Sequence, residues 1–67
     1  MRYGKITSLS DDYSSGTILE DYSNSKILIN NSSISKSERP HLKVGVRVSF
    51  DMQIRFEGYT AQKVEAA

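Results

Sequence analysis

The segment from Val46 to Met52 alternates strictly between apolar and polar residues, reading V-R-V-S-F-D-M. Successive side chains of a β-strand point to opposite faces, so this segment predicts a strand that is buried on one face only. Val46, Val48, Phe50 and Met52 are the residues expected to face inward. No segment repeats its apolar residues at the spacing of a long amphipathic helix. The pattern therefore predicts an all-β protein.

Four further strands are predicted from short apolar runs between polar segments, at Arg2–Leu9, Gly16–Glu20, Lys26–Asn30 and Thr60–Val64. Segments rich in Ser, Asp and Asn separate the first three strands and are typical of turns. The longest connection runs from Ser32 to His41, with a short helical turn expected around Ser33–Ser37. Arg55–Gly58 is expected to form the loop of the last hairpin. Short strands in this arrangement favour a small five-stranded antiparallel barrel.

The length of the chain, 67 residues, predicts a single domain spanning residues 1–67. A chain this short has no room for a deep enclosed cavity, so a site is expected on the surface. Cysteine is absent, which excludes disulfides and thiolate metal sites. The formal net charge of +1 excludes a strongly electrostatic nucleic-acid binder, although not a weak one. With no signal-peptide core and no membrane-spanning apolar run, we expect a cytoplasmic location and no membrane partner.

Several short motifs follow one another along the chain in a fixed order. They are Gly4-Lys5-Ile6, Gly16-Thr17-Ile18, Ile27-Leu28-Ile29, Ser32-Ser33-Ile34, Leu42…Gly45…Val48-Ser49-Phe50 and Gly58-Tyr59-Thr60-Ala61…Val64. In order and spacing they resemble the G-x-V, Gly-Phe-Ile, Val-Phe-Val, Ser-Ala-Ile, L-x-x-G-x-x-V-x-F and G-P-x-A-x-x-V motifs of the cold-shock domain. That family is a five-stranded OB-fold barrel that binds single-stranded DNA and RNA. The resemblance runs almost end to end and implies a core of Ile6, Ile18, Ile27, Ile29, Ile34, Val48, Phe50 and Val64.

The face that binds nucleic acid in that family departs from the family pattern here. Family members carry aromatic residues in a K-G-F-G-F motif on strand two and a V-F-V-H-F motif on strand three. The corresponding segments of this chain read Y-S-S-G-T and I-L-I-N-N. Ser8 stands at the family's tryptophan position, Leu9 at its phenylalanine position and Arg39 at an aromatic position of the long loop. Since stacking on an aromatic ring contributes about 1–3 kcal/mol per base, the resemblance implies weaker or differently based binding.

Candidate binding residues are carried over from this resemblance onto the same face. Thr17, Leu28 and Asn30 are expected to lie beneath the bases, because an asparagine side chain both donates and accepts hydrogen bonds. A solvated sheet face with one exposed leucine is the alternative interpretation. Tyr13 and Tyr59 are candidate stacking groups at its edge, whereas covering the ends of a small barrel is the alternative role for these rings.

Basic residues are scattered, and Lys5, Lys26 and Arg39 form the most plausible phosphate-binding cluster because they flank the family's binding face. The acidic residues of nearby loops oppose this interpretation: Asp11, Asp12, Asp21 and Glu57. Charges that serve only solubility are the alternative.

The chain shows no nucleophile elbow, phosphate loop or metal-ligand constellation, and its single histidine has no positioned partner in the sequence. We therefore expect no catalysis, no cofactor and no bound metal. Two hypotheses follow: a module that binds single-stranded DNA or RNA, or a protein-interaction or self-associating module that has lost nucleic-acid binding. In the second, the side chain of Leu28 or a free sheet edge is the expected contact surface.

Overall fold

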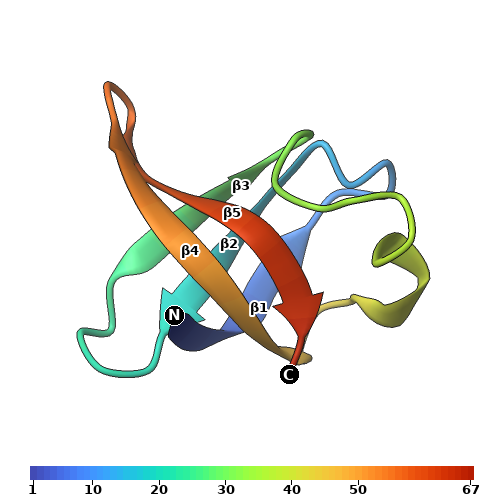
Figure 1. Cartoon of the computed structure of the whole chain (residues 1–67), viewed down its shortest axis with the longest axis horizontal. Coiled ribbons are helices and arrows are strands. Elements are labelled where there is room, and N and C mark those ends of the chain that lie inside the picture. Colours follow the sequence, from blue (N-terminus) through green and yellow to red (C-terminus); the bar gives the residue numbers. More distant parts are fainter.

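The computed structural model describes all of residues 1–67 and contains five strands and one short 3₁₀ helix (Figure 1). The strands are β1 (Arg2–Leu9), β2 (Ser15–Glu20), β3 (Lys26–Asn30), β4 (Arg47–Arg55) and β5 (Gly58–Ala66). The helical turn, η1, spans Arg39–His41. The chain has no helix with the length and apolar character needed to cross a lipid bilayer. The all-β, five-stranded prediction is confirmed.

The strands close into a barrel in the order β1-β2-β3-β5-β4, which is the arrangement of an OB-fold-like barrel. Every neighbouring pair is antiparallel except β3 and β5, which run parallel and share one register pair, Leu28 with Thr60. The predicted antiparallel OB-fold barrel is thus confirmed, with a parallel orientation at this one contact. In a closed ring of five strands, direction cannot alternate at every contact, so one pair of neighbours must be parallel. The long connection from Asn31 to Val46 makes that crossover.

The last hairpin is longer than its sequence pattern indicates. β4 continues to Arg55 and β5 starts at Gly58, so that the turn contains only Phe56 and Glu57. Gly58 adopts a φ of +124°, a conformation that side chains rarely allow and that closes the tight turn. Figure 1 shows this hairpin projecting beyond the rest of the barrel.

The helical turn expected around Ser33–Ser37 lies instead at Arg39–His41. Pro40 stands in the first turn of η1, where the fixed φ of proline suits a helix and its missing N–H costs nothing. Ser33 is committed elsewhere, because its hydroxyl donates to the Ala61 carbonyl at 2.6 Å and its carbonyl accepts from the Val64 N–H at 3.0 Å. These bonds to β5 hold the turn that begins the long connection, which spans residues 31–33, against the barrel.

The core consists of the ten apolar residues that are almost completely buried: Ile6, Ile18, Ile27, Ile29, Ile34, Leu42, Val48, Phe50, Ala61 and Val64. All eight core residues expected from the sequence are among them. The other two come from the loop before β4 and from β5. Val46 and Met52, at the ends of the alternating segment, are half-buried against this core. Ile27 and Ile29 point inward while Leu28 and Asn30 point outward, as the alternation predicts.

Candidate nucleic-acid interface

The outer face of β1, β2 and β3 brings two lysines into one row. Lys5 on β1 is paired with Leu19 on β2, and Leu19 is in turn paired with Lys26 on β3. Two strand spacings separate the lysine Cα atoms, a distance of about 10 Å. Both lysines are exposed, and Leu19 between them is 42% exposed. The row is thus cationic at both ends and apolar in the middle.

A cluster of hydroxyl groups forms the next row of the same face. The β1–β2 register shifts between Ile6 and Ser8, so that Thr7 and Ser8 both lie beside Thr17. The Thr17 hydroxyl is 2.6 Å from the Thr7 hydroxyl and 2.9 Å from the Ser8 hydroxyl. Such a bulge places two consecutive side chains on the same side of a strand. Thr17 is therefore held in place by β1, with Leu28 directly opposite it on β3.

Asn30, at the end of β3, is committed to the turn that follows it. Its side-chain oxygen accepts hydrogen bonds from the Ser32 N–H at 3.0 Å and the Ser32 hydroxyl at 2.7 Å, and the Ser33 Oγ atom lies 3.1 Å from it. An asparagine that closes a turn in this way cannot offer that oxygen to a ligand. Only its amide N–H groups, which make no hydrogen bond within the chain, remain for recognition. The structure thus leaves Asn30 half of the hydrogen-bonding capacity expected from the sequence.

A shallow, open hollow of about 480 Å³ adjoins the hydroxyl cluster on β1 and β2. Its lining is mainly small and polar: Ser8, Leu9, Ser10, Ser15, Gly16 and Thr17. Gly16 allows the close approach of β1 and β2 here, because a Cβ atom at this position would lie 2.5 Å from the Ser8 carbonyl oxygen. The hollow is open to solvent beside the hydroxyl cluster.

Tyr13 and Arg39 lie together at one end of the face. The Arg39 guanidinium carbon is 5.7 Å from the centre of the Tyr13 ring, within the range of a cation–π interaction. Tyr13, whose φ is +61°, also packs against the core. The Arg39 Nε atom is buried and has no hydrogen-bond partner. Arg39 is therefore held by Tyr13 and does not join Lys5 and Lys26 in one cluster.

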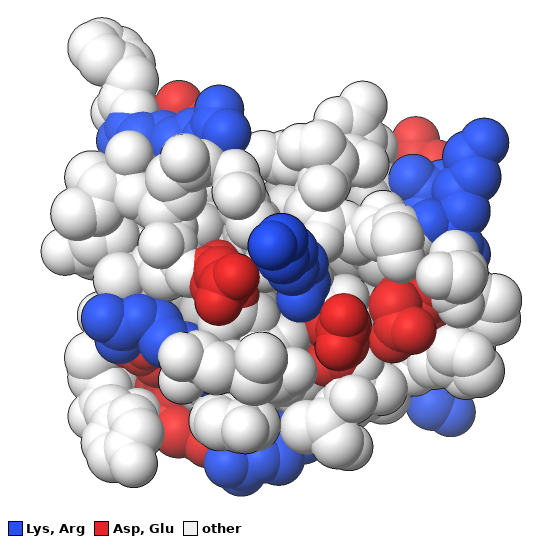
Figure 2. Space-filling view, in the orientation of Figure 1, with Lys and Arg blue, Asp and Glu red and all other residues white.

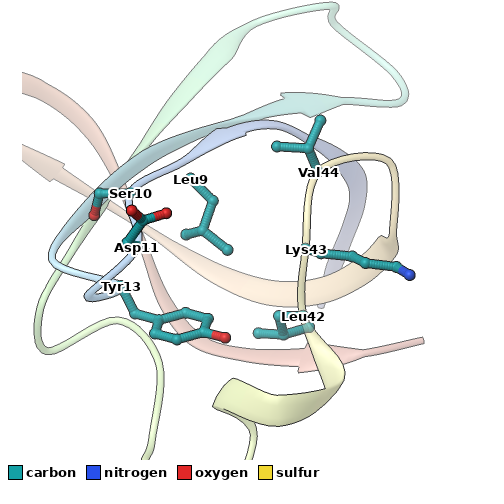
Figure 3. Close-up of a pocket in the computed structure, with 7 residues that line it drawn as sticks. All are labelled: Leu9, Ser10, Asp11, Tyr13, Leu42, Lys43 and Val44. Carbon is teal, nitrogen blue, oxygen red and sulfur yellow. The ribbon is translucent and has the colours of Figure 1, made fainter.

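A second hollow, of about 260 Å³, lies beside Tyr13 and shares Leu9 and Ser10 with the first (Figure 3). In the close-up the Tyr13 ring points toward Leu42, while the Lys43 amino group points away from the hollow. The two hollows therefore lie next to each other, on either side of Leu9 and Ser10.

Tyr59 lies at the other end of the barrel from Tyr13. It lines a hollow of about 200 Å³ together with Glu20, the last residue of β2, whereas Tyr13 precedes the first residue of that strand. A six-residue strand separates the two positions by about 17–20 Å. Tyr13 and Tyr59 therefore cannot stack on neighbouring bases, and the sequence could not show this because both sit beside turns.

Acidic groups near the lysine row are paired with basic groups of the chain. Glu20 is almost fully buried and forms an ion pair with Arg2 at 2.6 Å. Hydrogen bonds from Ser23 and Arg2 lower the pKa of Glu20 despite its burial. Asp21 pairs with Arg47 at 2.5 Å. Among the charged residues of β1, β2 and β3, Lys5 and Lys26 are the ones without an ion-pair partner.

The eight predicted site residues therefore separate into three places. Five lie on the outer face of β1–β3, two at the Tyr13 end and one at the Tyr59 end. The sequence analysis did not identify Leu19, Thr7 and Ser8 as members of this face. Leu19 could have been found, because it alternates outward with Thr17 along β2.

No three His, Cys, Asp or Glu side chains gather closely enough to hold a metal ion. No protein-family model and no curated protein matches the sequence. The resemblance to the cold-shock domain therefore rests on the motifs quoted for it, and the site on the geometry of its own side chains.

Proposed function

We propose that this chain is a non-catalytic, cytoplasmic module that binds single-stranded DNA or RNA on the outer face of β1–β3, in a manner that resembles a cold-shock domain without its aromatic platform. The observation that carries the proposal is the row of Lys5, Leu19 and Lys26. It places two lysines without ion-pair partners, with Cα atoms about 10 Å apart, on a face whose neighbouring acids are already paired. A backbone of phosphates is the ligand that such a row suits.

The neighbouring side chains suit the remaining parts of a nucleotide. Leu19 and Leu28 offer apolar contact to base faces, and the hydroxyls of Thr7, Ser8 and Thr17 offer hydrogen bonds to sugars or base edges. Tyr13, with Arg39 on its ring, borders the adjoining hollow and extends the path beyond the hydroxyl cluster. Tyr59 is too distant to take part in this path.

Binding on this basis is weak and sensitive to salt. Without an aromatic ring to stack on, each base loses about 1–3 kcal/mol of binding free energy. Two phosphate contacts correspond to a slope of about −1.4 in a plot of log affinity against log salt concentration for a single strand.

The proposal is tested by titrating isotope-labelled protein with single-stranded DNA and RNA heptamers of mixed sequence, at low and moderate salt. We expect salt-dependent NMR shifts at Lys5, Thr17, Leu19 and Lys26. The double variant Lys5→Gln/Lys26→Gln should lose about tenfold in affinity and most of the salt dependence.

The control for the loss of positive charge is Lys63→Asn on β5, because Figure 1 shows β4 and β5 in front of β1–β3. Lys63 is exposed and has a φ of +53°, which asparagine tolerates. This variant removes a positive charge away from the proposed face and should bind like the parent. Equal affinity of the double variant and the parent would disprove the assignment of phosphate binding to Lys5 and Lys26.

A protein-interaction module is the second candidate function. The observation that favours it is the exposure of large apolar side chains on the β4–β5 hairpin, where Ile54 is 75% exposed and Phe56 is fully exposed. Leu28, the contact expected from the sequence, is only half-buried and lies between Thr17 and Thr60. A folded Leu28→Asp variant that retains any self-association would remove Leu28 from this role.

A further inference from the structure

β4 has an open edge over its second half. It pairs with β1 from Arg47 to Phe50, where β1 itself begins at Arg2. Beyond that point β4 continues to Arg55 with β5 on one side and no strand on the other. An open edge of this kind carries backbone N–H and C=O groups that can pair with another strand.

The ladder with β5 determines which residues offer those groups. Arg55 is paired with Gly58 across the two-residue turn, and in such a hairpin this pair is hydrogen-bonded. Because hydrogen-bonded and non-hydrogen-bonded pairs alternate along an antiparallel ladder, Arg55, Gln53 and Asp51 bond to β5. Met52 and Ile54 therefore direct their backbone groups to the open edge.

The open segment is complementary to itself when reversed. It reads Asp51-Met52-Gln53-Ile54-Arg55. In an antiparallel pair centred on Gln53, Asp51 lies opposite Arg55 of a second copy, and Met52 lies opposite Ile54. The two charged residues make no ion pair within the chain. Opposite charges and apolar pairs facing each other across two strands are the arrangements that stabilise a sheet.

We propose that two copies of this chain associate through antiparallel pairing of their β4 edges, from Asp51 to Arg55, about a two-fold axis at Gln53. In this register Met52 and Ile54, whose backbone groups point outward, form the hydrogen-bonded pairs that an antiparallel ladder requires. The contact is isologous, so each ion pair and each apolar pair occurs twice. It also covers Ile54, which is 75% exposed in the single chain.

The surroundings of the edge agree with a second copy as the occupant. Red and blue groups are interspersed over the β4–β5 face in Figure 2, so that no charge of one sign dominates it and repels an identical face. An uncharged side chain projects at the upper left of that view, where Figure 1 has the β4–β5 turn. The edge contains no proline, and the irregularity of the β4–β5 register lies before it, between Ser49 and Asp51.

The proposed contact is small. Five residues from each copy fall well short of the roughly 800 Å² per partner of a standard interface, so we expect a weak dimer. Sedimentation equilibrium and NMR diffusion should detect it between about 20 µM and about 1 mM protein, in the absence of nucleic acid. A chain that remains monomeric at about 1 mM would overturn the proposal.

Exchanging the two charges provides the specific test. Asp51→Arg alone places two arginines opposite each other, and Arg55→Asp alone places two aspartates opposite each other. Because the two-fold axis doubles each effect, either variant should weaken association about tenfold. The double variant Asp51→Arg/Arg55→Asp has the same net charge as the parent and restores both pairs, so it should recover association.

Failure of the double variant to recover, or association unchanged in both single variants, would place the contact on another surface and overturn the proposal. Asp51 and Arg55 are exposed in the single chain. Circular dichroism establishes that each variant is folded. An isotope-filtered NOE between the methyl groups of Met52 and Ile54 in different copies gives a direct readout of register. The proposal does not rest on nucleic-acid binding, since the lysine row and the β4 edge are tested by separate variants.

Discussion

Asp12 organises the turn between β1 and β2 through a set of serine contacts. Its Oδ1 atom accepts hydrogen bonds from the Ser14 hydroxyl at 2.6 Å, the Ser10 hydroxyl at 2.9 Å and the Ser14 N–H at 3.1 Å. The hydrogen bonds from Ser14, followed in strength by the one from Ser10, lower the pKa of Asp12 from 3.8 to about 2. The same turn gives Tyr13 its φ of +61° and so holds the ring against Arg39.

The acid limb of the stability profile should therefore depend on Asp12. Since its pKa is lower in the folded chain than in the unfolded one, its contribution is complete above about pH 4 and is lost as the pH falls toward about 2. Asp12→Asn should flatten the melting temperature against pH over this interval. Asp11→Asn, which removes an exposed neighbour that makes no hydrogen bond, is the control. If the melting temperature of Asp12→Asn changed with pH as steeply as that of the parent, the acid limb could not be assigned to Asp12.

Ser33 is a second residue whose single hydroxyl connects distant parts of the chain. It is buried, donates to the Ala61 carbonyl at 2.6 Å and accepts from the Asn30 N–H at 2.9 Å. Ser33→Ala leaves both groups without this partner and should lower the free energy of unfolding by about 1–3 kcal/mol. The exposed Ser37→Ala should stay within about 0.5 kcal/mol of the parent. Urea denaturation of both variants measures the difference.

At the scale of elements, the contact between β1 and β2 depends on glycine. A Cβ atom on Gly16 would lie 2.5 Å from the Ser8 carbonyl oxygen and 3.1 Å from the Leu9 Cα atom, both parts of the backbone of β1. The strands would have to separate to admit it, and the hydroxyl cluster around Thr17 depends on their present spacing. The absence of a side chain at Gly16 therefore determines both the pairing of β1 with β2 and the shape of the proposed site.

Gly16→Ala should accordingly destabilise the chain by about 1–3 kcal/mol, the usual cost of overpacking. It should also shift the NMR signals of Ser8 and Leu9 on the opposite strand. Ser15→Ala, on the exposed face of the same strand, is the control and should do neither. Full stability in Gly16→Ala would show that β1 and β2 can separate here at no cost.

The sequence predicts elements where a local pattern determines them, and fails where distant contacts do. The alternation before Met52 and the isoleucines of β3 locate strands and core directly. The alternating pattern stops before the β4–β5 hairpin does, because that hairpin leaves the core and its side chains no longer need to alternate. Asn30 was expected to face a ligand, yet its side-chain oxygen accepts two hydrogen bonds from Ser32, which follows in the turn. The separation of Tyr13 from Tyr59 depends on which end of the barrel each turn occupies, which no local pattern records.

For the whole molecule, the weakest part of the barrel wall is the contact between β3 and β5. A single register pair, Leu28 with Thr60, joins these strands, whereas β4 and β5 are paired along most of their length. Ser33, just beyond β3, adds two further bonds along that seam, because its carbonyl accepts from the Val64 N–H at 3.0 Å and its hydroxyl donates to the Ala61 carbonyl at 2.6 Å. Local opening of a small barrel occurs where fewest bonds must break together.

Hydrogen exchange should show that the β3–β5 contact opens more readily than the rest of the barrel. We expect the Val64 amide to exchange about tenfold faster than the amides of Ile18 and Leu19 in β2, which is paired with β1 on one side and β3 on the other, under native conditions. NMR-detected exchange at several pH values measures both. Equal protection of the two sets would mean that the barrel opens only as a unit.

The two ends of the chain lie on opposite sides of β4. Val48 is paired with Gly4 on one side and with Ala66 on the other, and the Ala67 N–H bonds to the Arg47 carbonyl. Strand spacings place Met1 and Ala67 about 16 Å apart, a gap that a linker of about six residues spans. The chain can therefore be circularly permuted, with old ends joined beside β4 and new ends made at the projecting turn of Phe56 and Glu57. In such a permutant the order of strands along the chain changes while the order around the barrel does not.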